Sequence, residues 1–290
     1  MTFNSAHVVG ELLDSLPAAL AGVPARVVVV DNGSGDGTAD LLEARGDCRV
    51  VRAENRGYAA GLNRGVAELD GSGAILVLNP DVRLHPRSVP LMLDALAEPG
   101  TGIVAPLVLD EHGHRTSSLR REPTLLRALG LGRTGSAGLS EYVSDDASYQ
   151  APGTFDWALG AVLLMSRESY TRLGGWDESF FLYSEETDFC LRARDLGLAT
   201  RFCPAARAMH IGAASGTSAQ IHAMQIVNRV RLYGRRHVRP STALYLAVTV
   251  LSELSWLLRG HRQSATAINA LLVPARRPAP LGLDGRWLPH

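Results

Sequence analysis

The residues best suited to chemistry are acidic side chains and one histidine near apolar runs. Asp31 and Asp81 each come after a short aliphatic run, Glu185 and Glu186 are adjacent, and His210 lies beyond another apolar stretch. Carboxylates bind hard divalent cations, imidazole is acceptable to manganese, and a carboxylate can take a proton from a hydroxyl group. These residue types therefore suit metal-assisted chemistry or general-base catalysis.

Each of these residues also has a purely structural interpretation. The segment Asn79-Pro80-Asp81 could be a strand-ending turn, and a histidine beside apolar residues is often packed in a core. Glu185 and Glu186 follow Ser184, which is a good N-cap, and acids in a first helical turn stabilise the helix dipole. The residue types alone leave both interpretations open.

The elements that must position these residues alternate between strand and helix. Apolar runs predict strands at 26–30, 48–51 and 74–78, and helices are expected at 40–44 and 59–69. This order predicts an α/β fold with a parallel sheet and crossover helices. Ligands bind beyond the carboxyl ends of the strands in such sheets, and Asn4, Asp31 and Asp81 fall there.

The composition is that of a soluble α/β enzyme with an uneven distribution of charge. Of the 290 residues, 46% are hydrophobic and 20% are charged. Residues 221–290 contain ten arginines and two acidic residues, which suggests a polyanion near the C-terminus, either nucleic acid or an anionic membrane. Three unpaired cysteines and the lack of a secretory signal predict a cytoplasmic location.

Several motifs occur in an order that resembles glycosyltransferase family 2. They are TFNS, VVDNGSGDGT, NRGYAAGLNRG, LNPDV, GGWDESFFLYSEETDFCLRAR and MHIGAASG, and the fifth is the most specific. The similarity runs from Thr2 to about Gly216 and is closest to the bacterial rhamnosyltransferase-like branch. It implies a GT-A-like, Rossmann-related, mostly parallel sheet flanked by helices, inverting transfer from a nucleotide-diphosphate sugar, and Mg²⁺ or Mn²⁺ as cofactor.

The resemblance also implies roles for individual residues. Glu186 matches the catalytic base, and Asp81 and His210 match metal ligands, with Asn79 replacing the first acid of the D-x-D motif. Contacts to the nucleotide sugar are implied for Thr2, Phe3, Asp31, Gly57, Gly61, Asn63 and Asn79. The sugar or acceptor side is assigned to Trp157, Gly160, Asp177 and Glu185.

Some of these residues have competing or additional roles. Trp157 could equally be a core aromatic, and for Trp176 we favour a core position. Asp188 and Arg192 are four residues apart in an expected helix, so we expect them to form an ion pair.

The start of the chain departs from the family pattern. Family members usually have an apolar strand before the T-[YF]-N-S turn, whereas only Met1 precedes Thr2 here. We therefore expect a truncated first strand, and our hypothesis is a true start upstream of residue 1. A genuine short form is the alternative.

The resemblance to the family becomes weak beyond residue 220. We predict a catalytic domain at 1–220, a basic and amphipathic helical extension at 221–273, and a flexible tail at 274–290. The apolar run 243–258 has 16 residues, which is short of the roughly 20 that span a bilayer. We expect peripheral contact with the inner face of the plasma membrane through 229–262, with a helix packed on the domain or in a dimer as the alternative.

Two faces of the run 243–258 support this expectation. Leu244, Val248, Leu251, Leu254 and Leu258 form one stripe, while Thr249, Ser252 and Glu253 share another face. An apolar stripe opposite a polar face is typical of a helix that lies at an interface.

The function predicted from these features is inverting, metal-dependent glycosyl transfer. The donor is a nucleotide-diphosphate sugar, with dTDP-rhamnose favoured, and the acceptor is a cell-envelope glycan or a polyprenyl-diphosphate-linked glycan. A galactofuranosyl- or mannosyltransferase, and a non-catalytic nucleotide- or carbohydrate-binding relative, are the alternatives. No nucleic acid partner is expected, and the oligomeric state is left open.

Overall fold

The computed structural model describes residues 1–279 apart from 72, 135 and 213–217. The helices are α1 (Val9–Leu20), α2 (Thr38–Arg45), α3 (Tyr58–Ala67), α4 (Ser88–Leu96), α5 (Leu125–Ala128), α6 (Arg167–Leu173), α7 (Glu185–Asp195), α8 (Ala219–Arg236), α9 (Arg239–Leu258) and α10 (Gln263–Leu272). The strands are β1 (Val28–Asp31), β2 (Arg49–Arg52), β3 (Ile75–Leu78), β4 (Val82–Leu84), β5 (Thr101–Leu109), β6 (Leu119–Arg120), β7 (Gly153–Phe155), β8 (Trp157–Ala158), β9 (Val162–Met165) and β10 (Ala199–His210).

The central sheet is mixed rather than mostly parallel. Its strand order is β3-β9-β5-β10-β4, with β7 also paired to β10. The β5–β10 pair is parallel, whereas the β3–β9, β5–β9 and β4–β10 pairs are antiparallel. The expected α/β class is therefore correct, but the parallel sheet expected from the order of the first strands continues only as the separate pair of β1 and β2.

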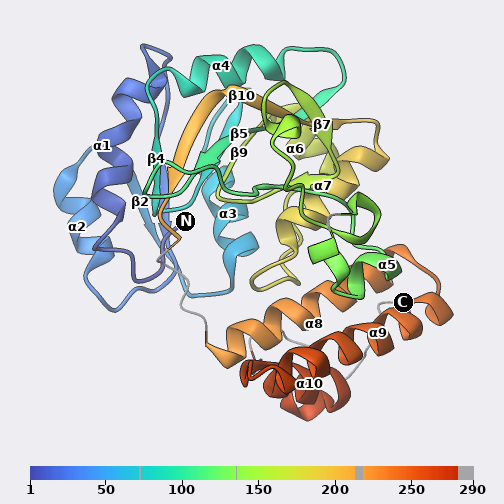
Figure 1. Cartoon of the computed structure of the whole chain (residues 1–290). Helices are drawn as coiled ribbons and strands as arrows, with labels where there is room; N and C mark the ends of the chain where they lie inside the picture. The colour runs from blue at the N-terminus through green and yellow to red at the C-terminus, as the bar shows by residue number, and fades with distance from the viewer. Residues whose placement is uncertain (72, 135, 213–217, 280–290) are drawn as a thin grey trace.

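Helices cover both faces of the sheet (Figure 1). Alternate residues of β9 point to opposite faces, as a strand requires. Leu163 packs in one core with α3 and α7, while Leu164 packs in a second core with α1 and α4. This two-sided burial explains why β9 is apolar at every position, because neither of its faces meets water.

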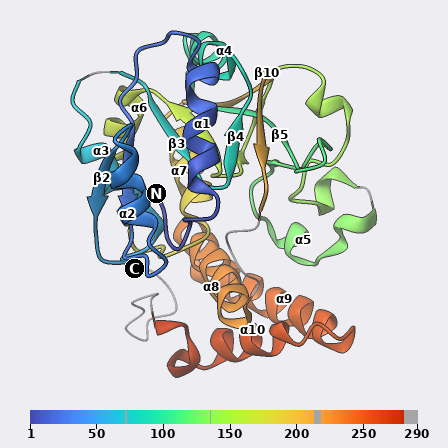
Figure 2. The same ribbon diagram turned by 90° about the vertical axis from the view of Figure 1, so that its left-hand side faces the viewer.

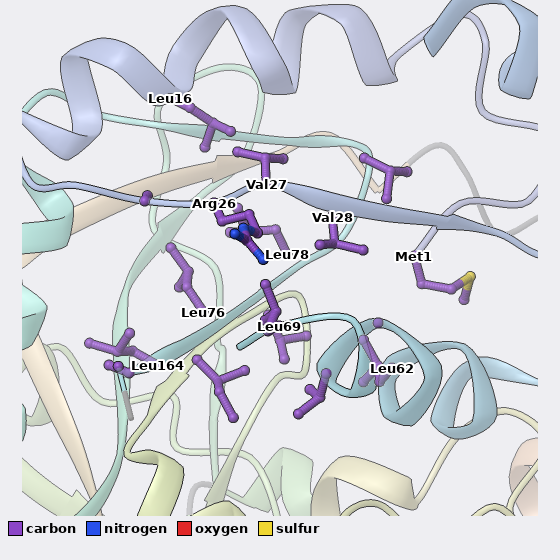
Figure 3. Close-up of a pocket in the computed structure, with 18 of the residues that line it drawn as sticks. Met1, Leu16, Arg26, Val27, Val28, Leu62, Leu69, Leu76, Leu78 and Leu164 are labelled. Carbon is purple, nitrogen blue, oxygen red and sulfur yellow. The ribbon is translucent and has the colours of Figure 1, made fainter. Parts of the chain in front are cut away.

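An apolar cavity separates β1 from β3 (Figure 3). Its volume is about 390 Å³, and it is lined by residues of β1, α1, α3 and β3, including Val28, Leu16, Leu62 and Leu76. Thr2 bridges Asp31 in parallel at one end of β1, and its amide nitrogen donates to the Val30 carbonyl oxygen at 2.8 Å. We call this space the β1–β3 cavity.

The helices α8, α9 and α10 form a layer beside the α/β part (Figures 1 and 2). They share a core that includes Val227, Tyr245 and Leu271 and is separate from the two cores at the sheet. The run expected to be helical from 243 belongs to the longer helix α9. Within the tail predicted at 274–290, a short 3-10 helix occupies Pro274–Arg276, and residues 280–290 lie outside the described residues.

Candidate active site

Strand pairing brings Asp81 and His210 together across 129 positions of sequence. Asp81 immediately precedes β4, His210 is the last residue of β10, and the antiparallel register places His210 opposite Val82. The His210 Nε2 atom lies 3.3 Å from the Asp81 Oδ1 atom. The Asp81 side chain is buried and His210 is half-buried, so this predicted ligand pair converges at an edge of the sheet.

Tyr58 connects this pair to the acidic residues of α7. Its hydroxyl donates to the Asn79 Oδ1 atom at 2.8 Å and lies 3.2 Å from the Gly160 carbonyl oxygen. Burial raises the pKa of Tyr58 well above its ordinary value, and the charges of Glu185, Glu186 and Asp81 raise it further. Tyr58 was not among the predicted site residues, because a tyrosine at the start of an apolar helix gives no chemical signal by itself.

Glu185 and Glu186 begin α7, where the Glu185 side chain is buried and that of Glu186 is half-buried. Burial raises the pKa of both carboxyl groups, and the charge of Glu186 adds to the rise at Glu185. The Oε2 atom of each has no hydrogen-bond partner within the part of the chain that the structure describes. Ionising either group in this setting is costly, so these carboxyls are poised to take up a proton.

Gly160 provides space for Glu186. A β-carbon added at Gly160 would lie 3.1 Å from the Glu186 Cβ atom, which is tighter than ordinary contact. Arg120 is a second neighbour of Glu186 that the sequence analysis did not identify. Its charge favours the ionised form of Glu186 and opposes the effect of burial on the pKa. The guanidinium group of Arg120 lies 3.9 Å from the centre of the Tyr142 ring.

The two glutamates belong to residues 177–188, which we call the acidic turn. Tyr183 and Ser184 both have positive φ values of 68° and 75°, a backbone region that non-glycine residues rarely adopt. The buried Asn228 side chain from α8 donates to the carbonyl oxygens of Leu182 and Tyr183 at 2.9 and 3.2 Å. Side-chain bonds from a distant helix therefore stabilise an unfavourable local conformation.

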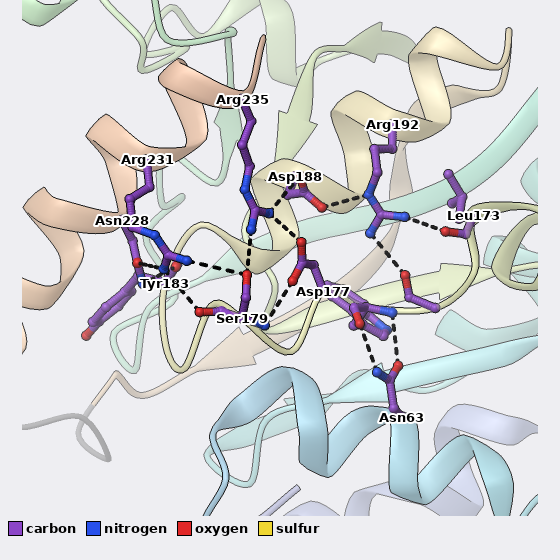
Figure 4. A network of polar contacts seen from close by, with 12 residues as sticks. Asn63, Leu173, Asp177, Ser179, Tyr183, Asp188, Arg192, Asn228, Arg231 and Arg235 are labelled. Atoms are coloured by element: carbon purple, nitrogen blue, oxygen red, sulfur yellow. Dashed lines mark hydrogen bonds and ion pairs between the residues drawn. The ribbon is translucent and has the colours of Figure 1, made fainter. Parts of the chain in front are cut away.

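Further contacts tie the acidic turn to α8 and to α7. Arg235 forms an ion pair with Asp177, and Arg231 donates to the Ser179 carbonyl oxygen at 3.1 Å (Figure 4). Burial opposes ionisation of Asp177, but hydrogen bonds from Ser179 and the charge of Arg235 lower its pKa overall. The predicted pair of Asp188 and Arg192 is confirmed, with Arg192 Nε 2.7 Å from Asp188 Oδ2.

The N-terminal turn forms a second group of predicted residues. The Thr2 hydroxyl donates to Asp31 Oδ1 at 3.1 Å, and the Ser34 backbone amide donates to Asp31 Oδ2 at 3.0 Å. Asp31 is buried, while Phe3 is 46% exposed and presents an aromatic surface to solvent. The turn is thus rigidly linked to the loop after β1, with Phe3 free of the core.

Gly57 meets the acidic turn at very close range. A β-carbon at Gly57 would lie 2.4 Å from the Phe181 carbonyl oxygen, and the φ angle of this residue is +100°. The next amide, that of Tyr58, donates to the same carbonyl at 2.7 Å. Gly57 therefore docks α3 against the turn, and its predicted contact with the nucleotide sugar stays a prediction.

Other predicted residues have partners within the protein. The Asn63 amide accepts from the Trp176 backbone amide at 2.9 Å and donates to the Trp176 carbonyl oxygen at 2.8 Å. Gly61 and Asn63 line a separate cavity of about 490 Å³ that also contains Arg56 and Arg64. These contacts give Asn63 a structural role, and its assignment to the nucleotide sugar stays a prediction.

The two tryptophans lie in the core beside α7. Trp157 is buried and its Nε1 atom donates to the Arg121 carbonyl oxygen at 3.1 Å, which fits the core interpretation. The core position favoured for Trp176 is confirmed, because this buried ring stacks on Phe189 with 4.3 Å between ring centres. The role predicted for Trp157 on the sugar side stays a prediction.

The donor set suits a hard divalent cation only in part. Among the described residues, no group of three or more His, Cys, Asp or Glu side chains is placed to hold a metal. Asp81 and His210 converge and supply the oxygen and imidazole donors that Mg²⁺ and Mn²⁺ accept, whereas the Asn79 oxygen is turned toward Tyr58. The residues present fit a cation that takes its remaining ligands from a bound diphosphate.

The fold and the site define a class of protein: an α/β protein with carboxylates and a histidine gathered beyond the strand ends. The glycosyl transferase family 2 profile matches residues 1–148, which is half of the chain. The chain belongs to glycosyl transferase family 2.

Two curated relatives are similar over about two thirds of this chain. The N-acetylglucosaminyl-diphospho-decaprenol L-rhamnosyltransferase of Mycobacterium tuberculosis (strain ATCC 25618 / H37Rv) is 30% identical over 207 residues, covering 64% of this chain and 66% of the relative. The low-salt glycan biosynthesis hexosyltransferase Agl10 of Haloferax volcanii is 28% identical over 204 residues, covering 69% and 63%. The similarity thus spans slightly less than two thirds of each relative.

Solved structures share the fold at low sequence identity. GalNAc-T7 with UDP, GalNAc and Mn²⁺ has a TM-score of 0.55 and 15% identity, covering 77% of this chain and 44% of that one. The mannosyltransferase PcManGT from Pyrobaculum calidifontis, in complex with GDP-Man and Mn²⁺, has a TM-score of 0.53 and 19% identity, covering 94% and 83%. The GT-A-like fold expected from the sequence is confirmed by these likenesses.

Proposed function

We propose that the chain catalyses inverting glycosyl transfer at the cytoplasmic face of the membrane, moving rhamnose from dTDP-rhamnose to a polyprenyl-diphosphate-linked glycan. The observation that carries the proposal is that the charges of Glu186 and Asp81 both act on Tyr58, while His210 Nε2 lies 3.3 Å from Asp81 Oδ1. A half-buried carboxyl of raised pKa and a carboxylate–imidazole pair are the two components that this reaction requires.

Glu186 is the proposed general base. As the acceptor hydroxyl oxygen bonds to the anomeric carbon, Glu186 takes the hydroxyl proton, and the bond from that carbon to the diphosphate oxygen breaks to release dTDP. Burial makes the Glu186 carboxylate a stronger base, while the charge of Arg120 opposes this rise in pKa. Gly160 has no side chain to displace Glu186 from this position.

Asp81 and His210 are the proposed residues that hold the cation, Mg²⁺ or Mn²⁺. The cation would neutralise charge on the leaving diphosphate. Because Asn79 carries no charge and its oxygen accepts from Tyr58, the protein offers one carboxylate where a D-x-D motif offers two. We expect the affinity for metal to be low without nucleotide and to rise when a diphosphate supplies further oxygen ligands.

The N-terminal turn is the proposed nucleotide end of the site. Phe3 offers an exposed ring for stacking on a base. The residue before it, Thr2, is hydrogen-bonded to Asp31. The donor and acceptor are proposed from the Mycobacterium tuberculosis relative, which is named as an L-rhamnosyltransferase acting on N-acetylglucosaminyl-diphospho-decaprenol. The second relative is named as a hexosyltransferase.

Calorimetric titration tests the donor and the metal together. We expect dTDP to bind more tightly than UDP, and only with Mn²⁺ present, and we expect Asp81→Ala and His210→Ala to weaken that binding. Unchanged Mn²⁺-dependent binding in both variants would contradict the ligand assignment. Tighter binding of UDP or of GDP would redirect the donor to a galactofuranosyl or a mannosyl nucleotide, and no binding of any nucleotide would favour a non-catalytic relative.

A further inference from the structure

Helix α9 exposes several leucines to solvent and buries polar side chains beside the core residue Tyr245. Leu244, Leu251, Leu254 and Leu258 are exposed, with Leu258 at 81%. Thr242, Thr249 and Glu253 are buried on the opposite side, and Glu253 is only 5% exposed. A helix packed on a soluble domain would have the reverse arrangement, because burial of apolar surface is the main favourable term.

The buried polar groups fix this orientation. Glu253 Oε2 lies 2.8 Å from the His222 Nε2 atom of α8. The Tyr245 hydroxyl accepts from Arg229 Nε at 3.0 Å. Rotating α9 to cover its leucines would break these bonds and expose the Tyr245 ring, so the exposed face is a stable property of the fold.

A distant segment extends the same surface. Helix α5 packs beside α9, and a β-carbon at Gly130 would lie 3.1 Å from the Ser252 Oγ atom. In this segment Leu126, Leu129 and Leu131 are exposed, with Leu126 at 59%. We call these three leucines and the four of α9 the leucine surface; nothing in the sequence near 126–131 indicated that it would join α9.

The charges around the leucine surface have one sign. Residues 123–140 and 239–279 together contain seven arginines and a single acidic residue, Glu253, which is buried. Arg239 is exposed at the start of α9, and Arg259 and Arg262 are exposed just beyond its end. The surface therefore combines an apolar centre with cationic ends, and these two segments contribute no exposed carboxylate to it.

We propose that the leucine surface docks on an anionic phospholipid bilayer, with α9 lying flat in the interface. Leucines would enter the acyl boundary, and the arginines at the two ends of α9 would meet lipid phosphates. The helix is long and apolar enough to cross a membrane by length and composition, but 22% of its most apolar window is buried against the protein. The polar face bonded to α8 therefore favours a helix on the membrane surface.

This docking would place the site close to the bilayer. Helix α8 lies between α9 and the acidic turn, because it contacts α9 through His222 and the turn through Asn228. Packed helices lie about 8–10 Å apart, so the site would stand roughly one to two helix layers above the interface. A lipid-linked acceptor could reach it at that height, although the docking proposal itself does not depend on the proposed function.

Vesicle co-sedimentation of the full chain tests this docking. We expect binding to vesicles of equal phosphatidylglycerol and phosphatidylcholine, and much weaker binding to phosphatidylcholine alone. Leu251→Glu with Leu258→Glu should lower the affinity by at least ~10-fold, and Arg259→Glu with Arg262→Glu by a smaller factor that disappears at high salt. Leu41→Glu, at an exposed leucine of α2 remote from this surface, is the matched control and should bind like the wild type.

Three results would overturn the proposal. One is vesicle binding that survives both double variants while far-UV circular dichroism shows them folded. Another is a wild-type dimer that the leucine variants convert to a monomer with no vesicle binding in any form, which would make the surface a contact between two copies. The third is resistance of the bound protein to alkaline carbonate extraction, which would indicate a spanning helix. Folded leucine variants that lose binding to anionic vesicles support it.

Discussion

The acidic turn and the β1–β3 cavity lie at the same sheet but are built in opposite ways. In the acidic turn, polar side chains of α3, α7 and α8 meet the backbone through bonds such as those from Asn228 to Leu182 and Tyr183. In the β1–β3 cavity, aliphatic side chains border about 390 Å³ of space (Figure 3). Hydrogen bonds are directional and hydrophobic contacts are not, so the first region holds precise geometry and the second supplies stability with looser packing.

The largest expected effect is the loss of turnover when Glu186, in the acidic turn, is replaced. Glu186→Gln keeps the shape of the side chain but cannot accept the acceptor proton, so we expect turnover to fall by roughly 10²–10⁴-fold with donor affinity nearly unchanged. Steady-state rates and nucleotide titration measure the two quantities. Glu168→Gln, at an exposed acid of α6, is the control, and retained turnover in Glu186→Gln would remove this residue from the proposed role.

The next effect tests how tightly the acidic turn is docked. Gly57→Ala places a β-carbon against the Phe181 carbonyl oxygen at a positive φ angle, so we expect a loss of roughly 3 kcal/mol or more of unfolding free energy. Chemical denaturation measures it. Gly35→Ala, where a β-carbon meets open space, should change stability by less than about 0.5 kcal/mol. Equal effects would mean that α3 and the turn are not in close contact.

The stability lost on truncating a leucine should differ between a filled core and the β1–β3 cavity, and two leucines of neighbouring strands allow that comparison. Leu163 of β9 is fully buried away from the cavity, whereas Leu76 of β3 lines it and is half-buried. We expect Leu163→Ala to cost about 3–4 kcal/mol and Leu76→Ala about 1–2 kcal/mol, because a side chain beside a void loses fewer contacts. Matching losses in denaturant titrations would show that the cavity is filled in solution.

The smallest effect concerns the pH dependence of stability at Glu185. Burial, and then the charge of Glu186, raise the pKa of this carboxyl in the folded chain above its unfolded value. Its contribution to stability is therefore present below the unfolded pKa and is lost as the pH rises through the folded pKa. Glu185→Gln should raise the melting temperature at pH 8 and give no gain at pH 4.

A control variant isolates the effect of burial in that experiment. Glu111→Gln, at an exposed carboxyl, should leave the melting temperature unchanged at both pH values. If Glu185→Gln lowers the melting temperature at pH 8, the carboxylate has a stabilising partner in solution, and the contrast between the polar turn and the apolar cavity would need revision.

Much of the local structure could be predicted because it follows from local patterns. The helices expected at 40–44 and 59–69 correspond to α2 and α3, and the runs at 26–30 and 74–78 predict β1 and β3. The pairing of Asp188 with Arg192 follows from helical geometry alone. Strand direction could not be predicted in the same way, because β3 pairs with β9, about 90 residues later in the chain.

The candidate site was predictable in its residue types but not in its arrangement. Glu186, Asp81 and His210 were identified from motifs, yet Tyr58, Asn228 and Arg120 were not, because each acts only through neighbours distant in sequence. Asn63 shows what a motif leaves out. Its place in a glycine-rich motif suggested a ligand contact, which stays a prediction, but gave no sign that its amide bonds to the Trp176 backbone.

The sequence by itself determined the family, the strands and helices, and the acids and the histidine that chemistry would use, because periodicity and motif order are properties of short segments. Only the tertiary structure decided which groups meet. The β4–β10 register joins Asp81 to His210, α8 holds the acidic turn, and α5 joins α9 in one exposed apolar surface. These contacts link residues far apart in the chain. The exposure of a side chain and the pKa of a buried group depend on which segments pack around them, so neither can be read from a short stretch of sequence.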